Sequence, residues 1–148
     1  MRVWRILLIA SGIVLLLLAA CLFIPAVQSA LSGLPAYAVG GFVRDLLLER
    51  VVNDFDIVIE GDAISFAKLL AGTYGGKVTA HKKFGTAKWW PDADKNPATF
   101  LDLITARSEI YRSPAALPTV KFSNLSDDIL RRDFTVNTLA MRLDGDHF

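Results

Sequence analysis

Two aspartates separated by one residue, Asp54 and Asp56, are the first side chains in this sequence whose spacing suggests chemistry. They stand at the start of a β-branched run that predicts a strand over 56–60, and residues two apart in a strand point to the same side. Carboxylates placed in this way can jointly hold Mg²⁺, which prefers oxygen ligands and accompanies substrate phosphates. The same pattern also occurs on ordinary solvated surfaces, so both interpretations stand at this point.

A third carboxylate, Asp102, lies in the middle of the apolar run 100–104, within a predicted strand over 99–105. A carboxylate is costly to bury without a partner. We therefore expect either a metal ion or an arginine beside Asp102, and Arg107 is the structural candidate.

Two consecutive glycines, Gly40 and Gly41, follow the short apolar stretch 36–39 and precede a segment with helical apolar spacing over 42–50. Glycine has no Cβ, so a phosphate can approach the backbone N–H groups and the start of the helix. Arg44, one turn into that helix, can donate two parallel hydrogen bonds to phosphate oxygens. A Gly-Gly pair after a strand is equally an ordinary turn.

The segment 130–140 contains two arginines, Arg131 and Arg132, followed directly by Asp133. Such a group can form an internal ion pair while one guanidinium reaches a triphosphate. Taken alone, the segment is equally a solvated face near the start of a helix.

Together, the glycine motif, the aspartate pair and the arginine motif resemble the head domain of the class II tRNA CCA-adding enzyme and poly(A) polymerase family, which is part of the DNA polymerase β nucleotidyltransferase superfamily. The resemblance runs from about 34 to 143 and includes the segments 84–86, 102–107 and 114–118. It implies an α/β (α+β) head domain over 34–148, with a small mixed sheet flanked by helices. Because the chain ends soon after the arginine motif, we expect it to lack the neck and body domains of the family.

The resemblance also implies an activity and roles for residues. The reaction implied is template-independent addition of CMP or AMP, from CTP or ATP, to the 3′ end of an RNA, in particular tRNA, by two-metal phosphoryl transfer. The implied magnesium ligands are Asp54 and Asp56, with Asp102 as the third acidic position. The implied nucleotide contacts are Gly40, Gly41, Arg44 and Arg131, and the bracing residues are Arg132, Asp133 and Asn137.

A small group of lysines, Lys82, Lys83 and Lys88, lies beside Trp89 and Trp90. Lysines can follow an RNA phosphate backbone, and a tryptophan can stack on a base. The alternative is that the lysines are solvated and the tryptophans are packed in the core.

Apolar periodicity, glycines and prolines predict the elements that position these motifs. We expect strands over 36–39, 56–60, 77–80, 86–90 and 99–105, and helices over 42–50, 64–74 and 126–131, with a further helix from about 135. We expect loops over 91–97 and 107–124.

Residues 1–33 form a separate apolar segment that precedes the predicted head. The uncharged run 6–24 has 19 residues, enough for a helix that spans the hydrocarbon core of a bilayer. The alternatives are a secretory signal, a lipidated Cys21, a buried helix, or an upstream stretch joined to the start of a soluble protein. Because ATP, CTP and immature tRNA are cytoplasmic, we expect a cytoplasmic head whether or not this segment is a membrane anchor.

The composition narrows the classes of function. The 148 residues are 53% hydrophobic with a net charge of +1, which excludes a disordered chain and any global attraction to nucleic acid. The single cysteine excludes an internal disulfide framework. Two other functions stay open: a non-catalytic, membrane-anchored fragment that binds nucleotide, and a nucleotidyltransferase that acts on a small molecule.

Overall fold

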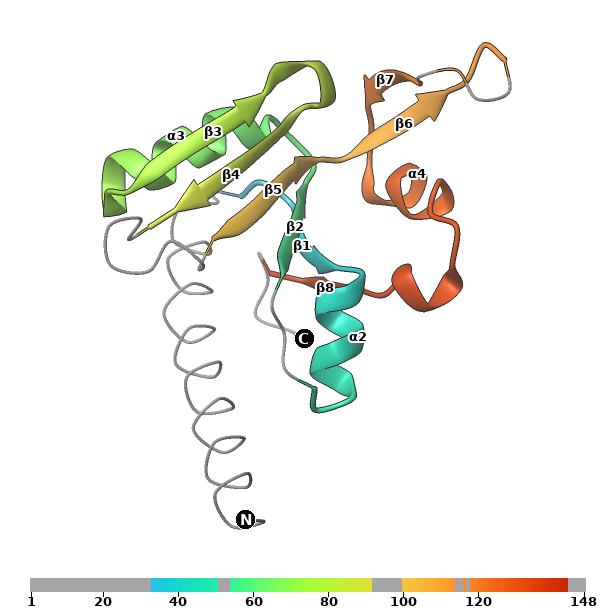
Figure 1. Ribbon diagram of the computed structural model, residues 1–148, viewed down its shortest axis with the longest axis horizontal. Coiled ribbons are helices and arrows are strands. Elements are labelled where there is room, and N and C mark those ends of the chain that lie inside the picture. Colours follow the sequence, from blue (N-terminus) through green and yellow to red (C-terminus); the bar gives the residue numbers. More distant parts are fainter. Residues whose placement is uncertain (1–32, 51–53, 92–99, 114–115, 117, 144–148) are drawn as a thin grey trace.

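The computed structural model describes residues 33–50, 54–91, 100–113, 116 and 118–143, which form a mixed sheet with helices packed against it (Figure 1). The strands of this sheet are β1 (Ala36–Val39), β2 (Phe55–Ile59), β3 (Lys77–His81), β4 (Thr86–Trp90), β5 (Leu101–Thr105) and β8 (Ala140–Arg142). Their order across the sheet is β3-β4-β5-β2-β1-β8. The neighbours β2 and β5 are parallel, whereas the other pairs are antiparallel.

The helices are α2 (Gly41–Leu47), α3 (Ala63–Tyr74) and α4 (Leu125–Leu130), with short 3₁₀ turns η1 (Lys82–Phe84) and η2 (Thr135–Asn137). The helix α3 begins at Asp62, whose carboxylate accepts hydrogen bonds from the backbone N–H groups of Ile64 and Ser65. It ends at Gly75, and its buried side chains pack against β4 and β5. The predicted mixed α/β fold is therefore confirmed.

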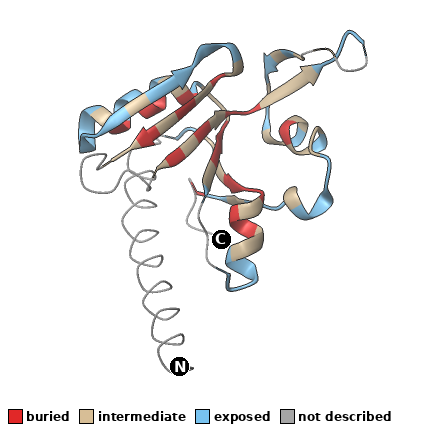
Figure 2. Cartoon of the chain, viewed as in Figure 1, coloured by how far each residue is buried: buried red, intermediate tan, exposed pale blue. Residues whose placement is uncertain are grey.

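Buried and less buried residues alternate along the central strands, which distinguishes the two faces of the sheet (Figure 2). The face toward α3 carries the main hydrophobic core, with Ile57 and Ile59 of β2, Leu101 and Leu103 of β5, and Trp89 of β4. Because successive strand residues point to opposite faces, the residues between these core positions lie on the other face. That other face carries the polar residues Asp56, Asp102 and Lys88, and it is the face that positions the candidate site.

Two expectations for the C-terminal part were wrong. The segment 107–124 is not a loop, because it contains the strands β6 (Arg107–Ile110) and β7 (Thr119–Phe122), which pair as an antiparallel hairpin. The helix expected from about 135 is the 3₁₀ turn η2, followed by β8, which pairs with β1 at the sheet edge. The short helix expected over 126–131 is α4, which is capped by Asn124.

The predicted membrane span over 6–24 and most of the loop over 91–97 lie outside the described residues. Within the described part of the chain, no helix combines the length and the apolar character needed to cross a bilayer.

Candidate active site

A row of three charged residues crosses the face of the sheet opposite α3. Lys88 of β4 is paired in register with Asp102 of β5, and Asp102 is paired in register with Asp56 of β2. Neighbours across a sheet point to the same face, so the three side chains stand side by side. The register between strands, and not closeness in sequence, brings Asp102 to the Asp54–Asp56 pair.

Asp56 lies in a site with excess negative charge. Burial raises its pKa above the ordinary aspartate value, and the neighbouring carboxylates of Asp102 and Asp54 raise it further. The positive charges of Arg132 and Lys88 act in the opposite direction but do not cancel this effect. Asp54 and Asp56 therefore lie within electrostatic reach of each other, as their spacing predicts.

The partner of Asp102 is Lys88 and not Arg107, so that expectation was wrong. The Lys88 Nζ atom is 2.7 Å from Oδ2 of Asp102, and both side chains are partly exposed. Arg107 lies beyond the end of β5, where its Nη1 donates to the backbone carbonyl of Phe84 and its guanidinium pairs with Glu109.

The glycine motif forms a turn that requires glycine. Gly40 has a φ of 69° and a ψ of −132°, a backbone conformation that side chains strongly disfavour. A Cβ atom at Gly40 would also lie 3.1 Å from Nη1 of Arg132. The Gly40 N–H donates to the carbonyl of Leu139, so the glycine motif and the arginine motif meet here.

Arg44 lies in α2 directly after this turn. Its Nε and Nη2 atoms donate to the two carboxylate oxygens of Asp45 at 2.8 Å each, and its Nη1 donates to Oδ1 of Asn137 at 3.0 Å. The hydrogen bonds and charge of this pair hold the pKa of Asp45 below and that of Arg44 above their ordinary values. Asn137 thus braces Arg44 across the two motifs.

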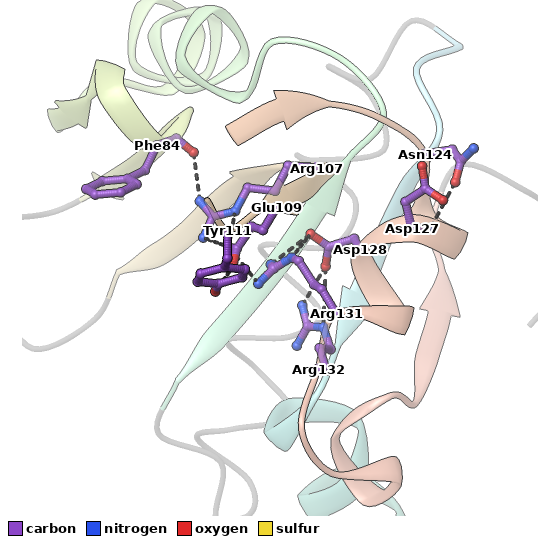
Figure 3. Close-up of polar contacts among 9 residues, drawn as sticks. All are labelled: Phe84, Arg107, Glu109, Tyr111, Asn124, Asp127, Asp128, Arg131 and Arg132. Carbon is purple, nitrogen blue, oxygen red and sulfur yellow. Dashed lines mark hydrogen bonds and ion pairs between the residues drawn. The ribbon is translucent and has the colours of Figure 1, made fainter. Parts of the chain in front are cut away.

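The two arginines of the arginine motif are held by one buried carboxylate, Asp128 (Figure 3). Arg131 donates to Oδ1 of Asp128 through Nε and Nη2, and Arg132 donates to Oδ2 through the same two atoms. Asp128 is fully buried, whereas the two guanidinium side chains stay partly exposed. Asp133 is exposed.

Glu109 of β6 extends this network to the hairpin (Figure 3). Its Oε1 atom accepts from Arg107 and Arg131, and its Oε2 atom accepts from the hydroxyl of Tyr111 at 2.6 Å. Burial opposes ionisation of Glu109, but the Tyr111 hydrogen bond and the two arginines hold its pKa below the ordinary value. Sequence reasoning missed Asp128 and Glu109. For Asp128, its position three and four residues before the arginines was a usable signal.

The other lysines predicted to contact RNA lie elsewhere. Lys82 and Lys83 are exposed in the turn η1, which connects β3 to β4. Trp89 is buried, and its indole N–H donates to the carbonyl of Gly75, so it packs in the core and cannot stack on RNA.

A divalent cation at Asp54 and Asp56 would have an open coordination shell. Within the described part of the chain, no three His, Cys, Asp or Glu side chains are grouped so that they could enclose a metal ion. Two carboxylates with free positions beside them suit Mg²⁺, because this ion commonly binds through one or two carboxylates together with substrate phosphates.

Comparison with known proteins places the chain in a family. Over 116 residues it is 50% identical to the A-adding tRNA nucleotidyltransferase of Geobacter sulfurreducens, covering 78% of this chain and 13% of that protein. Over 107 residues it is 44% identical to the A-adding tRNA nucleotidyltransferase of Halalkalibacterium halodurans, covering 72% of this chain and 24% of that protein. The chain therefore spans less than a third of the length of these relatives.

Solved structures agree with this comparison. An apo form of a CCA-adding enzyme matches with a TM-score of 0.71 at 38% identity, over 82% of this chain and 28% of that one. A tRNA nucleotidyltransferase complexed with a primer tRNA and an incoming ATP analog matches with a TM-score of 0.64 at 36% identity, over 82% of this chain and 32% of that one. The sequence profile described as the poly A polymerase head domain matches residues 36–148, so this chain belongs to the poly A polymerase head domain family.

Proposed function

We propose that this chain is the nucleotidyltransferase head of an enzyme that adds a nucleotide to the 3′ end of tRNA. The observation that carries the proposal is that three separate motifs meet at Arg132, whose Nη1 lies beside Gly40 and whose positive charge acts on Asp56. The relatives named A-adding are 44–50% identical to this chain, whereas those named CCA-adding are 36% identical, and a CC-adding relative and the CCA-adding enzyme structure are each 38% identical. This difference favours AMP over CMP as the added nucleotide.

Asp54 and Asp56 would hold Mg²⁺, and the excess negative charge around Asp56 supports this assignment. When bound, the metal would supply activation of the RNA 3′-hydroxyl and stabilisation of the charge on the departing pyrophosphate. The residues of the chain bind and orient the nucleotide. The Gly40–Gly41 turn lets a phosphate approach the backbone closely, and Arg44, fixed by Asp45 and Asn137, supplies positive charge beside it.

The geometry supports an exchange of the roles predicted for the two arginines. Arg131, the expected nucleotide contact, donates through Nε, Nη1 and Nη2 to Asp128 and Glu109. Arg132, the expected brace, donates to Asp128 through Nε and Nη2 and directs its Nη1 toward Gly40. We therefore assign phosphate contact to Arg132 and the bracing role to Arg131. Lys82 and Lys83 stay as predicted RNA contacts.

The test is incorporation of labelled ATP or CTP into tRNA that lacks its 3′ terminus. We expect the wild-type chain with Mg²⁺ to incorporate label, and the Asp54→Ala plus Asp56→Ala double variant to lose this activity. Asp127→Asn, which changes a carboxylate of α4 that hydrogen-bonds Ser123, is the matched control and should stay active. Incorporation by the wild type that does not exceed that of the double variant would refute catalysis by this chain.

A second candidate is a head that binds nucleotide without transferring it. It predicts ATP binding, measured by equilibrium dialysis, with no incorporation. A small-molecule acceptor would instead leave transfer intact after substitution of Lys82 and Lys83.

A further inference from the structure

We propose that Lys88 is a positioning residue that acts as a built-in counter-ion of Asp102 and restricts the metal site to Asp54 and Asp56. The inference rests on the proposed function, because it concerns the same carboxylates, and it assigns Asp102 a role different from that of a third metal ligand.

The first support is the way in which the ammonium group of Lys88 is held. On one side, Nζ is 2.7 Å from Oδ2 of Asp102. It also lies over the ring of Phe100, 4.0 Å from the centroid, where the negative face of the ring attracts a cation. The Phe100 ring in turn packs against Trp90 at 5.9 Å between centroids. Lys88 is therefore fixed by two independent contacts beside the carboxylate.

The second support is the balance of charge along the row. Asp56 is influenced by two like charges, Asp102 and Asp54, and by two opposite charges, Arg132 and Lys88. A carboxylate oxygen that accepts from an ammonium at 2.7 Å is already satisfied, so Asp102 offers a cation less than a free carboxylate would.

The consequence is a site whose affinity for a free divalent cation is kept low. Two carboxylates bind Mg²⁺ weakly unless substrate phosphates complete its shell. Removing the charge of Lys88 frees Asp102 and converts the site into one with three carboxylates, which would bind a divalent ion without nucleotide.

The test is binding of Mn²⁺ alone to the purified chain, measured from the electron paramagnetic resonance signal of the free ion. We expect Lys88→Met, which keeps an unbranched side chain of similar length without the charge, to bind Mn²⁺ about tenfold more tightly than the wild type, because one nearby positive charge is lost. Lys88→Arg keeps the ion pair, and Lys77→Met makes the same change of net charge on exposed β3, so both should stay within about twofold of the wild type.

Two further variants keep the test independent of how well Lys88→Met folds. Asp102→Asn leaves Lys88 without its counter-ion beside Asp56 and should weaken Mn²⁺ binding by about threefold or more. The double variant Lys88→Met plus Asp102→Asn removes a neutral pair and should return the affinity close to that of the wild type. Far-UV circular dichroism checks the fold of each protein.

The outcomes separate this inference from the proposed function. If wild type binds Mn²⁺ but Lys88→Met binds no more tightly, or if the double variant keeps the tighter binding, the role of Lys88 is refuted and the metal site stands. If wild type binds Mn²⁺ no better than the Asp54→Ala plus Asp56→Ala variant, the metal site itself is refuted, and with it the need for a counter-ion.

Discussion

Asp128→Asn is the substitution that tests most directly how the arginines of the site are held. Asp128 is fully buried and accepts four hydrogen bonds from Arg131 and Arg132, at 3.1, 2.8, 3.3 and 2.9 Å. Asparagine has the same shape but no charge, and its NH₂ group would face a guanidinium. One oxygen acceptor is lost, and two cations lose their shared counter-ion.

The expected cost follows from these contacts. Removing one partner of a buried ion pair costs about 3–5 kcal/mol, because the remaining charge is left uncompensated. Here Arg131 keeps Glu109 at 3.2 Å, and the guanidinium side chains are 22% and 17% exposed, so water and Glu109 relieve part of the penalty. We therefore expect the free energy of unfolding to fall by about 3 kcal/mol, the lower end of that range.

Urea unfolding followed by tryptophan fluorescence measures this change, since Trp89 is buried and reports on the core. The matched control is Asp127→Asn, which removes the neighbouring charge in the first turn of α4 and weakens the hydrogen bond that Asp127 accepts from Ser123. The control should cost only about 1 kcal/mol. A loss for Asp128→Asn no larger than that of the control would show that Asp128 does not carry the arginines in the way the geometry indicates.

Three other predictions concern single positions. Gly40→Ala, at a φ of 69°, should lower the free energy of unfolding by about 1–2 kcal/mol and weaken ATP binding. Gly72→Ala, in open space on α3, should instead raise the free energy of unfolding by about 0.5–1 kcal/mol. Urea midpoints of the two variants that move in the same direction would contradict this. The hydrogen bond from the Ser65 hydroxyl and two backbone N–H groups hold the pKa of Asp62 below its ordinary value, so its carboxylate stabilises the fold above that value and loses this effect as pH falls. Asp62→Ala should thus cost about 1 kcal/mol at pH 7, and the difference from wild type should narrow below about pH 4; a gap independent of pH in thermal melts would refute the linkage. Asp56→Asn removes a carboxylate whose pKa is raised by burial and by like charges, so the metal-free variant should have a higher melting temperature than the wild type at pH 7. A lower melting temperature would contradict the excess of negative charge inferred around Asp56.

The sequence predicted the central strands well because each is a short run with a strong local signal. The segments 36–39, 86–90 and 99–105 are apolar or alternate, and glycines mark where the chain turns. The hairpin of β6 and β7 has no such signal, because its strands mix charged and polar residues and form a two-stranded sheet exposed on much of its surface. What defines it is pairing between strands and the contacts of Arg107 and Glu109, which depend on residues distant in sequence.

The strand β8 was missed for a related reason. It is three residues long and mostly exposed, and it exists because it pairs with β1, a segment about a hundred positions earlier. The Leu143 N–H donates to the carbonyl of Ala36 just beyond this pairing, and that long-range contact leaves no periodic trace in the sequence.

The same distinction between local and non-local information applies to the candidate site. The carboxylates Asp54 and Asp56 were proposed from their spacing, which is a local property of the chain; in the structure Asp56 lies in β2 and Asp54 directly precedes it. The partner of Asp102 was assigned wrongly because the choice between Arg107 and Lys88 depends on the register of β4 against β5, which composition does not encode. The motifs therefore identified the acidic side chains, whereas the pairing of strands determined which cation lies beside Asp102. A substitution that shifted β4 by one residue would move Lys88 to the core face and leave Asp102 unpaired, although every motif in the sequence would be unchanged.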